Sequence, residues 1–196
     1  MPEGDTIFRS ARTLHLALAG HDVVRFETRY AHLQRVHDQD PITGRRVEAV
    51  TARGKHLLMA FSGGLVLRTH MRMSGSWHLY RAGERWQRPR EQMRIVLQAG
   101  GFEAVAFLVH EAELIGTKQL ERALERLGPD VLAPAFDSVQ AAERVLGAGA
   151  RLICDVLLDQ RVLAGIGNVY KSELLFLTRI HPLRAANELD PCSARE

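Results

Sequence analysis

The sequence is poor in cysteine and lacks any long apolar run. Its 196 residues include only two cysteines, Cys154 and Cys192. Two are too few for a disulfide scaffold or for a zinc site made of four cysteines within this chain. No apolar stretch approaches the roughly 20 residues that cross a bilayer. Glu3 and Asp5 stand where a secretory signal carries basic residues. The sequence therefore predicts a protein of the cytosol with no membrane partner.

A metal-binding pattern is also missing from the sequence. Nine histidines are present, but none forms a His-x-His or His-Glu-x-x-His arrangement. We therefore expect solvated or packed histidines and no metal ligands. The sequence has no internal repeat and no low-complexity tract.

The composition is otherwise that of an ordinary globular protein, with a mild excess of positive charge. Hydrophobic residues make up 46% and charged residues 25%, and the formal net charge is +3. The positive charge is mostly arginine, whose planar fork suits phosphates and base edges. This excess is compatible with nucleic acid without proving it. The length allows one sizeable core or two small ones.

The chain opens with an amphipathic pattern and continues as short strands. Ile7, Ala11, Leu14 and Leu18 lie on one face of a helix predicted over residues 6–19. Tight turns separate short apolar or alternating runs from residue 23 to about residue 115, and Gly100-Gly101 joins the last pair as a hairpin. This pattern predicts a β-sandwich with a flanking helix. The predicted strands are 23–27, 47–50, 56–61, 65–68, 76–81, 93–98 and 103–108.

The last third of the chain reads as helical. Helices are predicted over residues 118–126, 138–146, 151–159 and 168–178, with a hinge at 127–134. We predict an α+β fold with an N-terminal β-sandwich domain over 1–130 and a helical domain over 131–196. No closing element follows Pro191-Cys192, so we expect the helical domain to be incomplete.

The first residues carry a possible nucleophile. Removal of Met1 would leave Pro2 with a free secondary amine, and an α-amino group has a pKa of about 8. Such an amine attacks an electrophilic sugar carbon to give an iminium, and Glu3 beside it offers a carboxyl for proton transfer. Taken alone, Met-Pro-Glu is also a common start without chemical meaning.

A glycine-rich turn between two predicted helices is the second chemical feature. Gly165 and Gly167 allow a tight turn, and Asn168 opens the next helix. Backbone N–H groups at a helix start form a phosphate site, and Asn168 could cap the helix or donate its amide to phosphate. The alternative is an ordinary helical turn packed for stability.

Taken together, these features resemble the formamidopyrimidine-DNA glycosylase/endonuclease VIII family of bifunctional base-excision enzymes. The resemblance spans essentially the whole chain. It rests on the Pro2-Glu3-Gly4-Asp5-Thr6 start, on Arg53-Gly54-Lys55-His56-Leu57, and on the turn from Leu158 to Asn168, which looks like the family's helix–two-turns–helix motif.

The resemblance implies a role for each matching residue. Pro2 matches the nucleophile that attacks C1′ of the damaged nucleotide, and Glu3 matches the acid/base that protonates the opening sugar. Lys55 matches a lysine that contacts phosphate and assists β-elimination; by itself it could be a solvated strand-end lysine. Asn168 matches the phosphate-binding asparagine of the turn.

Further DNA contacts are implied in two places. The loop His70-Met71-Arg72-Met73-Ser74-Gly75 matches the segment that family members insert into the duplex when a base is flipped. Met73 and Arg72 would fill the gap and face the orphaned base, whereas Met71 could equally be a core residue. Arg126 resembles a DNA contact or a plain helix-end arginine.

The sequence departs from the family pattern at two points. The C-terminal β-hairpin finger, commonly a four-cysteine zinc site, is missing, which puts the activity of this chain in doubt. The Arg-Arg-Phe-Gly stretch of the 8-oxoguanine branch is also missing, since residues 102–109 read Phe-Glu-Ala-Val-Ala-Phe-Leu-Val. This departure and Gly4-Asp5-Thr6 favour the endonuclease VIII branch.

The resemblance therefore implies a DNA glycosylase with abasic-site lyase activity that acts on damaged DNA, mainly oxidised pyrimidines. We expect a monomer that needs neither metal nor small cofactor. Two alternatives remain: an 8-oxoguanine-directed glycosylase of the same family, or a non-catalytic DNA-binding relative that shows salt-sensitive binding without strand cleavage.

Overall fold

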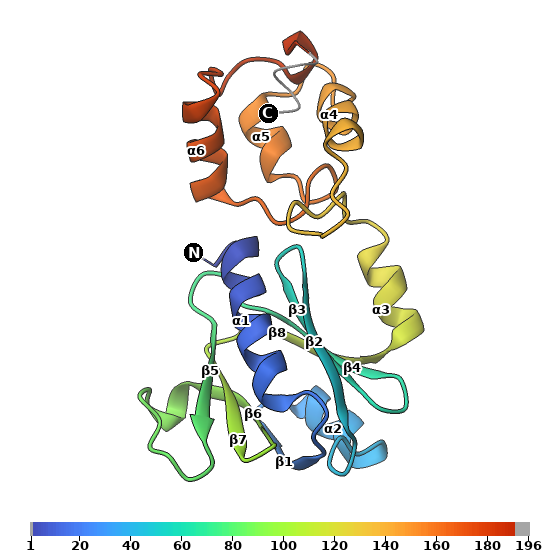
Figure 1. Cartoon of the computed structure of the whole chain (residues 1–196), viewed down its shortest axis with the longest axis vertical. Coiled ribbons are helices and arrows are strands. Elements are labelled where there is room, and N and C mark those ends of the chain that lie inside the picture. The colour runs from blue at the N-terminus through green and yellow to red at the C-terminus, as the bar shows by residue number, and fades with distance from the viewer. Residues whose placement is uncertain (1, 191–196) are drawn as a thin grey trace. The chain divides into compact units, whose positions relative to one another are not determined.

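The computed structural model describes residues 2–190 and divides into two compact units (Figure 1). The first unit contains residue 2 and residues 6–52 and 56–123. The second contains residues 124–190 together with two short segments, 3–5 and 53–55. Met1 and Cys192 lie outside the described residues. The predicted domain limits of 1–130 and 131–196 stay a prediction.

The first unit is built on two four-stranded sheets, with strand orders β1-β6-β7-β5 and β2-β3-β4-β8. Neighbouring strands of the first sheet pair antiparallel, as do β3 with β4 and β4 with β8. The predicted α+β class and β-sandwich are confirmed. The strands are β1 (Val23–Thr28), β2 (Val47–Arg53), β3 (His56–Phe61), β4 (Leu65–His70), β5 (Ser76–Arg81), β6 (Met93–Ala99), β7 (Phe102–Phe107) and β8 (Glu111–Gly116).

Helix α1 (Gly4–Leu18) contributes to the same core as both sheets. Its predicted apolar face is buried at Ile7, Ala11, Leu14 and Leu18. These four side chains pack in one cluster with residues such as Leu57, Leu67, Leu97 and Ala104 from the two sheets. The 3.6-residue spacing of apolar residues therefore predicted the buried face correctly.

Three further helical segments complete the first unit: α2 (Ala31–Gln39), the 3₁₀ turn η1 (Arg90–Gln92) and α3 (Thr117–Leu124). Helix α2 was not predicted, because Leu33 is its only buried residue and its other positions are mostly polar. The hairpin turn between β6 and β7 is confirmed. Gly100 and Gly101 both have positive φ, 58° and 79°, as a two-residue turn of this kind requires.

The second unit is helical, with α4 (Ser138–Leu146), α5 (Ile153–Leu158), α6 (Asn168–Leu177) and the 3₁₀ turn η2 (Ala186–Glu188). Its own apolar core includes Val145, Val156, Ile166 and Leu175. Asp137 caps α4 by accepting hydrogen bonds from the backbone N–H groups of residues 139 and 140. Between residues 2 and 190, no helix is both long and apolar enough to cross a membrane.

Candidate active site

The carboxyl group of Glu3 is buried and binds the start of helix α6. The residue is 2% exposed. Oε1 accepts a hydrogen bond from the Val169 N–H at 2.7 Å, and Oε2 accepts two, from Gly167 at 3.0 Å and Tyr170 at 3.1 Å. Both carboxyl oxygens are therefore held in place by backbone donors, and the residue that follows Pro2 is fixed.

This contact replaces an ordinary helix cap. The N-cap residue of α6 is Gly167, which has no side chain to accept a hydrogen bond. The first N–H groups of a helix need acceptors, and a negative charge is favoured there by the helix dipole. A Cβ atom at Gly167 would lie 2.4 Å from Cδ of Glu3. Glycine at this position therefore makes room for the carboxylate, which acts as the cap.

The turn that leads into α6 is held by Gln160, a residue without an assigned role at the sequence level. Its Nε2 donates to the carbonyl oxygens of Leu158 at 3.0 Å and Ile166 at 2.9 Å. Its Oε1 accepts from the Gly165 N–H at 3.0 Å. The Gly165 carbonyl in turn accepts from the Gly4 N–H at 2.9 Å. The side chain of Gln160 thus holds the backbone of the turn in shape, and the turn binds the N-terminal segment at Gly4.

Asp130 connects a third segment, the turn at Gly54, to this site. The sequence alone gave Asp130 no role. It is buried, and its Oδ2 accepts a hydrogen bond from the Gly54 N–H at 2.6 Å. Its Oδ1 accepts from the Leu132 N–H at 3.0 Å. Gly54 has a φ of 56°, a left-handed conformation that favours glycine. Asp130 therefore fixes the turn that presents Lys55. Its sequence setting, Gly-Pro-Asp, indicated only a hinge.

Lys55 is partly buried and lies within the electrostatic reach of Glu3. Burial lowers the pKa of its ammonium group, and the negative charge of Glu3 opposes that shift. Loss of solvent disfavours the charged form of an amine, while a nearby carboxylate favours it. A lysine with a lowered pKa releases its proton more readily than a solvated one. Pro2, directly before Glu3, is partly buried.

Asn168 and Lys171 lie together on the first turn of α6. Asn168 is exposed, and its Oδ1 accepts a hydrogen bond from Nζ of Lys171 at 3.0 Å. Asn168 does not cap the helix, contrary to one of the two expected roles. Three of the backbone N–H groups at this helix start are already bonded to Glu3, so a phosphate would depend on these side chains. The i, i+3 spacing could have indicated Lys171.

The predicted insertion loop in the first unit is divided between core and surface. Met71 is buried, which supports the core alternative, whereas Met73 is 72% exposed. Arg72 has a φ of 53° and an exposed side chain paired with Glu111. Arg126, in the second unit, is exposed just beyond the end of α3. These positions leave Arg72, Met73 and Arg126 accessible to a ligand.

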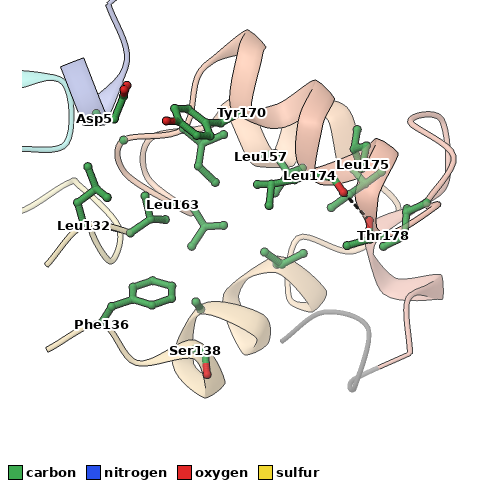
Figure 2. A pocket seen from close by; sticks show the side chains of 18 of the residues that line it. Asp5, Leu132, Phe136, Ser138, Leu157, Leu163, Tyr170, Leu174, Leu175 and Thr178 are labelled. Carbon is green, nitrogen blue, oxygen red and sulfur yellow. Dashed lines mark hydrogen bonds between the residues drawn. The ribbon is translucent and has the colours of Figure 1, made fainter. Parts of the chain in front are cut away.

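The second unit also contains an apolar cavity of about 350 Å³ (Figure 2). Leu132, Phe136, Leu163 and Leu174 are among the side chains around it. Among the described residues that line it, Asp5 is the only carboxylate, and none is a lysine, arginine, histidine or cysteine. The lining is therefore mostly apolar and holds no cationic side chain. Across residues 2–190, no cluster of three or more histidine, cysteine or acidic side chains could hold a metal ion.

Comparison with known proteins places this arrangement in a family. The profile of the formamidopyrimidine-DNA glycosylase N-terminal domain matches residues 1–108, and that of the formamidopyrimidine-DNA glycosylase H2TH domain matches residues 127–195. The two matches together contain Glu3, Lys55, Asp130, Asn168 and the turn between α5 and α6.

Curated relatives agree with both profiles. The probable endonuclease 8 2 of Streptomyces coelicolor is 43% identical over 190 residues, covering 96% of this chain and 67% of the relative. The endonuclease 8 2 of Mycobacterium tuberculosis is 39% identical over 186 residues, covering 93% and 70%. The DNA-(apurinic or apyrimidinic site) lyase Nei2 of Mycolicibacterium smegmatis is 35% identical over 177 residues, covering 90% and 67%.

The fold is shared with solved structures as well. A complex of wild-type Lactococcus lactis Fpg (MutM) with DNA that contains N7-benzyl-Fapy-dG superposes with a TM-score of 0.84 at 23% identity, covering 98% of this chain and 73% of the other. The profiles, the identities and the fold lead to one conclusion. The chain belongs to the formamidopyrimidine-DNA glycosylase/endonuclease VIII family.

Proposed function

We propose that the protein is a bifunctional DNA glycosylase and abasic-site lyase of base-excision repair. One observation carries the proposal beyond family membership. Directly after Pro2, the buried carboxyl of Glu3 is fixed by three backbone N–H groups and acts electrostatically on Lys55, an amine with a lowered pKa. A nucleophile next to a positioned acid/base and a nearby amine is an arrangement suited to covalent catalysis.

In the proposed reaction, the free amine of Pro2 attacks C1′ of the damaged nucleotide. The bond from C1′ to the base breaks, and the base leaves with the bonding electron pair and takes up a proton. The Pro2 nitrogen, positively charged after the attack, loses its proton to the Glu3 carboxylate. Glu3 passes this proton to the ring oxygen as the sugar opens, which leaves an iminium between Pro2 and C1′. The iminium accepts the electron pair of the C2′–H bond as that proton passes to water, and the pair then expels the 3′ phosphate. Lys55 assists this elimination and stabilises the leaving phosphate.

The proposed DNA contacts are exposed side chains. Asn168, with Lys171 beside it, would bind a backbone phosphate at the start of α6. Arg126 would add a second cationic contact. Met73 and Arg72 would enter the duplex where the damaged nucleotide leaves the stack, because an unbranched thioether fills an irregular gap and a guanidinium can face the orphaned base.

We further propose oxidised pyrimidines as the main substrates. The curated relatives named above include endonucleases 8, and residues 102–109 lack the Arg-Arg-Phe-Gly stretch of the 8-oxoguanine branch. A duplex with one oxidised pyrimidine should therefore lose its base faster than a matched duplex with 8-oxoguanine. Equal or reversed rates would favour the 8-oxoguanine alternative.

Borohydride trapping tests the covalent step. Reduction of the iminium in the presence of a damaged duplex should join protein and DNA permanently, and Pro2→Gly should abolish or strongly reduce the adduct. Glu173→Gln, a change of an exposed carboxylate on α6, is the matched control and should trap like the parent. If Pro2→Gly trapped as well as the parent, or if the mature protein kept Met1, the mechanism would be wrong.

The same preparation tests the remaining proposals of a cofactor-free monomer in the cytosol. Trapping should be unchanged after exhaustive treatment with EDTA, since no step requires a metal. The adduct should contain one protein chain per lesion, which its mass would establish. Fractionation of cells should recover the protein with the cytosol. Binding to damaged DNA without any adduct or cleavage would instead support a non-catalytic relative.

A further inference from the structure

The connection between β5 and β6 in the first unit holds an unusual concentration of positive charge. Residues 81–94 contain five arginines and two glutamates, a surplus of three positive charges that equals the formal net charge of the whole chain. Figure 1 shows this connection leaving the arrowhead end of β5. None of these arginines belongs to the proposed reaction centre.

The connection is anchored to the sheet by Trp86. Its indole N–H donates to Oε2 of Glu103 at 2.6 Å, and its ring meets the edge of Phe107 with centroids 5.7 Å apart. The guanidinium of Arg90 lies over the same indole, 5.5 Å from its centroid. Glu103 is buried and also accepts a hydrogen bond from Arg25 at 3.0 Å. The anchor therefore holds the connection in a defined shape, and Arg25 neutralises its buried carboxylate.

Two arginines of the connection are available for a ligand. Arg25 and Arg90 are both paired with Glu27. Within the part of the chain that the structure describes, Arg85 and Arg88 make no hydrogen bond or ion pair, and Arg85 is exposed. Both line an open, polar hollow of about 680 Å³. A guanidinium without a carboxylate partner keeps its full capacity for a bidentate bond to an oxyanion.

We propose that this arginine connection, residues 81–94, is a second contact for the phosphodiester backbone of DNA, outside the reaction centre. The proposal rests on the proposed function, which supplies DNA as the polyanion. Phosphate oxygens match the two free guanidinium groups. Arg90 already lies over one face of Trp86, and the indole N–H is bonded to Glu103. The contact would therefore read the backbone and not the bases.

The connection folds back over its own sheet. It begins at Arg81, the end of β5, yet Trp86 contacts Phe107. Phe107 pairs with Ser76, the residue that follows the predicted insertion loop at 70–75. Arg85 and Arg88 flank Trp86, so they do not lie a full strand length beyond that loop.

Salt-dependent binding to undamaged DNA tests the proposal. The single variants Arg85→Ala and Arg88→Ala and the double variant would be compared with the parent chain on a duplex of about 30 base pairs. Each lost phosphate contact should lower the slope of log K against log salt by about 0.9, so the double variant should lose about 1.8. Arg35→Ala, which removes an exposed arginine from α2, is the control for each single variant because it removes the same single charge.

The proposal would be overturned if Arg85→Ala and Arg88→Ala each changed the slope no more than Arg35→Ala does. Binding of a poly-glutamate peptide that is lost in the double variant would then assign the surface to an acidic protein. This assay uses undamaged DNA and measures binding alone, so it does not depend on the covalent step. Failure of the parent to form a borohydride adduct would therefore contradict the proposed function without changing the interpretation of the binding result.

Discussion

Replacing Glu3 with glutamine tests whether the buried carboxylate stabilises the start of α6. The substitution keeps the size of the side chain and changes only its charge and one oxygen. In the native site, Oε2 accepts two backbone hydrogen bonds and Oε1 accepts the one from Val169. The amide of glutamine can supply the first oxygen. Its NH₂ group must then face the Val169 N–H, so two donors meet and one buried N–H loses its acceptor.

The cost follows from two effects. A buried donor left without an acceptor costs about 1–3 kcal/mol. Loss of a negative charge at a helix N-terminus costs a further ~0.3–2 kcal/mol, with partly buried sites at the upper end. We therefore expect Glu3→Gln to lower the free energy of unfolding by about 2–4 kcal/mol. This is a large fraction of the stability of a typical domain.

Two measurements check this value. Urea denaturation gives the change in the free energy of unfolding, and amide hydrogen exchange should show that protection of the Gly167, Val169 and Tyr170 amides falls more than that of β-strand amides. Glu173→Gln, the same chemical change at an exposed position of α6, should alter stability by less than about 0.5 kcal/mol. If Glu3→Gln were as stable as that control, the carboxylate would not be the cap of α6.

The remaining predictions concern other parts of the site and the neighbouring strand. Asp130→Asn should cost about 1–3 kcal/mol of unfolding free energy and also reduce borohydride trapping, because it loosens the turn before Lys55; full trapping in a destabilised variant would contradict that positioning role. Gly167→Ala should lower the free energy of unfolding by about 1–3 kcal/mol, because its methyl group would overlap the carboxyl of Glu3. Urea denaturation measures this change. Burial, helped by the positive charges of neighbouring residues, lowers the pKa of His56 from 6.5 to about 4. As pH falls from 6.5 to 4, His56 binds a proton in the unfolded chain but not in the folded chain, so the free energy of unfolding should drop by up to about 3 kcal/mol. His56→Gln should remove that part of the pH dependence. Burial lowers the pKa of Lys55, so the rate of cleavage that needs its ammonium form should fall as pH rises through that lowered pKa. In Lys55→Arg this fall in rate should occur at higher pH. If the fall stayed at the same pH, another group would be the one that titrates.

Local patterns in the sequence were sufficient for most of the elements. The apolar spacing in α1 and the glycine pair of the β6–β7 turn each act within a few residues, so the physics that forms them is visible in a short window. Helix α2 was invisible for the same reason, because a single buried leucine gives no periodicity. The identity of the motifs was also enough to name the family, whereas the roles of Glu3 and Lys55 stay predictions.

Contacts between distant segments could not be predicted in this way. Glu3 and Tyr170 are 167 positions apart, and Gly54 and Asp130 are 76 positions apart. The residues next to each of them in the sequence do not indicate which distant residue it contacts. The sequence could therefore suggest a free helix start for phosphate but could not show that Glu3 already occupies it. Burial alone separated Met71 from Met73, because both have the same side chain and occupy neighbouring positions of one loop.

The bond between Glu3 and the α6 start also constrains when the protein can become active. Its acceptor is made early on the ribosome, and its donors follow 164 to 167 positions later. Chains are synthesised at about 5–20 residues per second, so the carboxyl of a nascent chain waits roughly ten seconds or longer for its donors. Until then nothing caps the future α6 start, and the residue that follows Pro2 is not held in place.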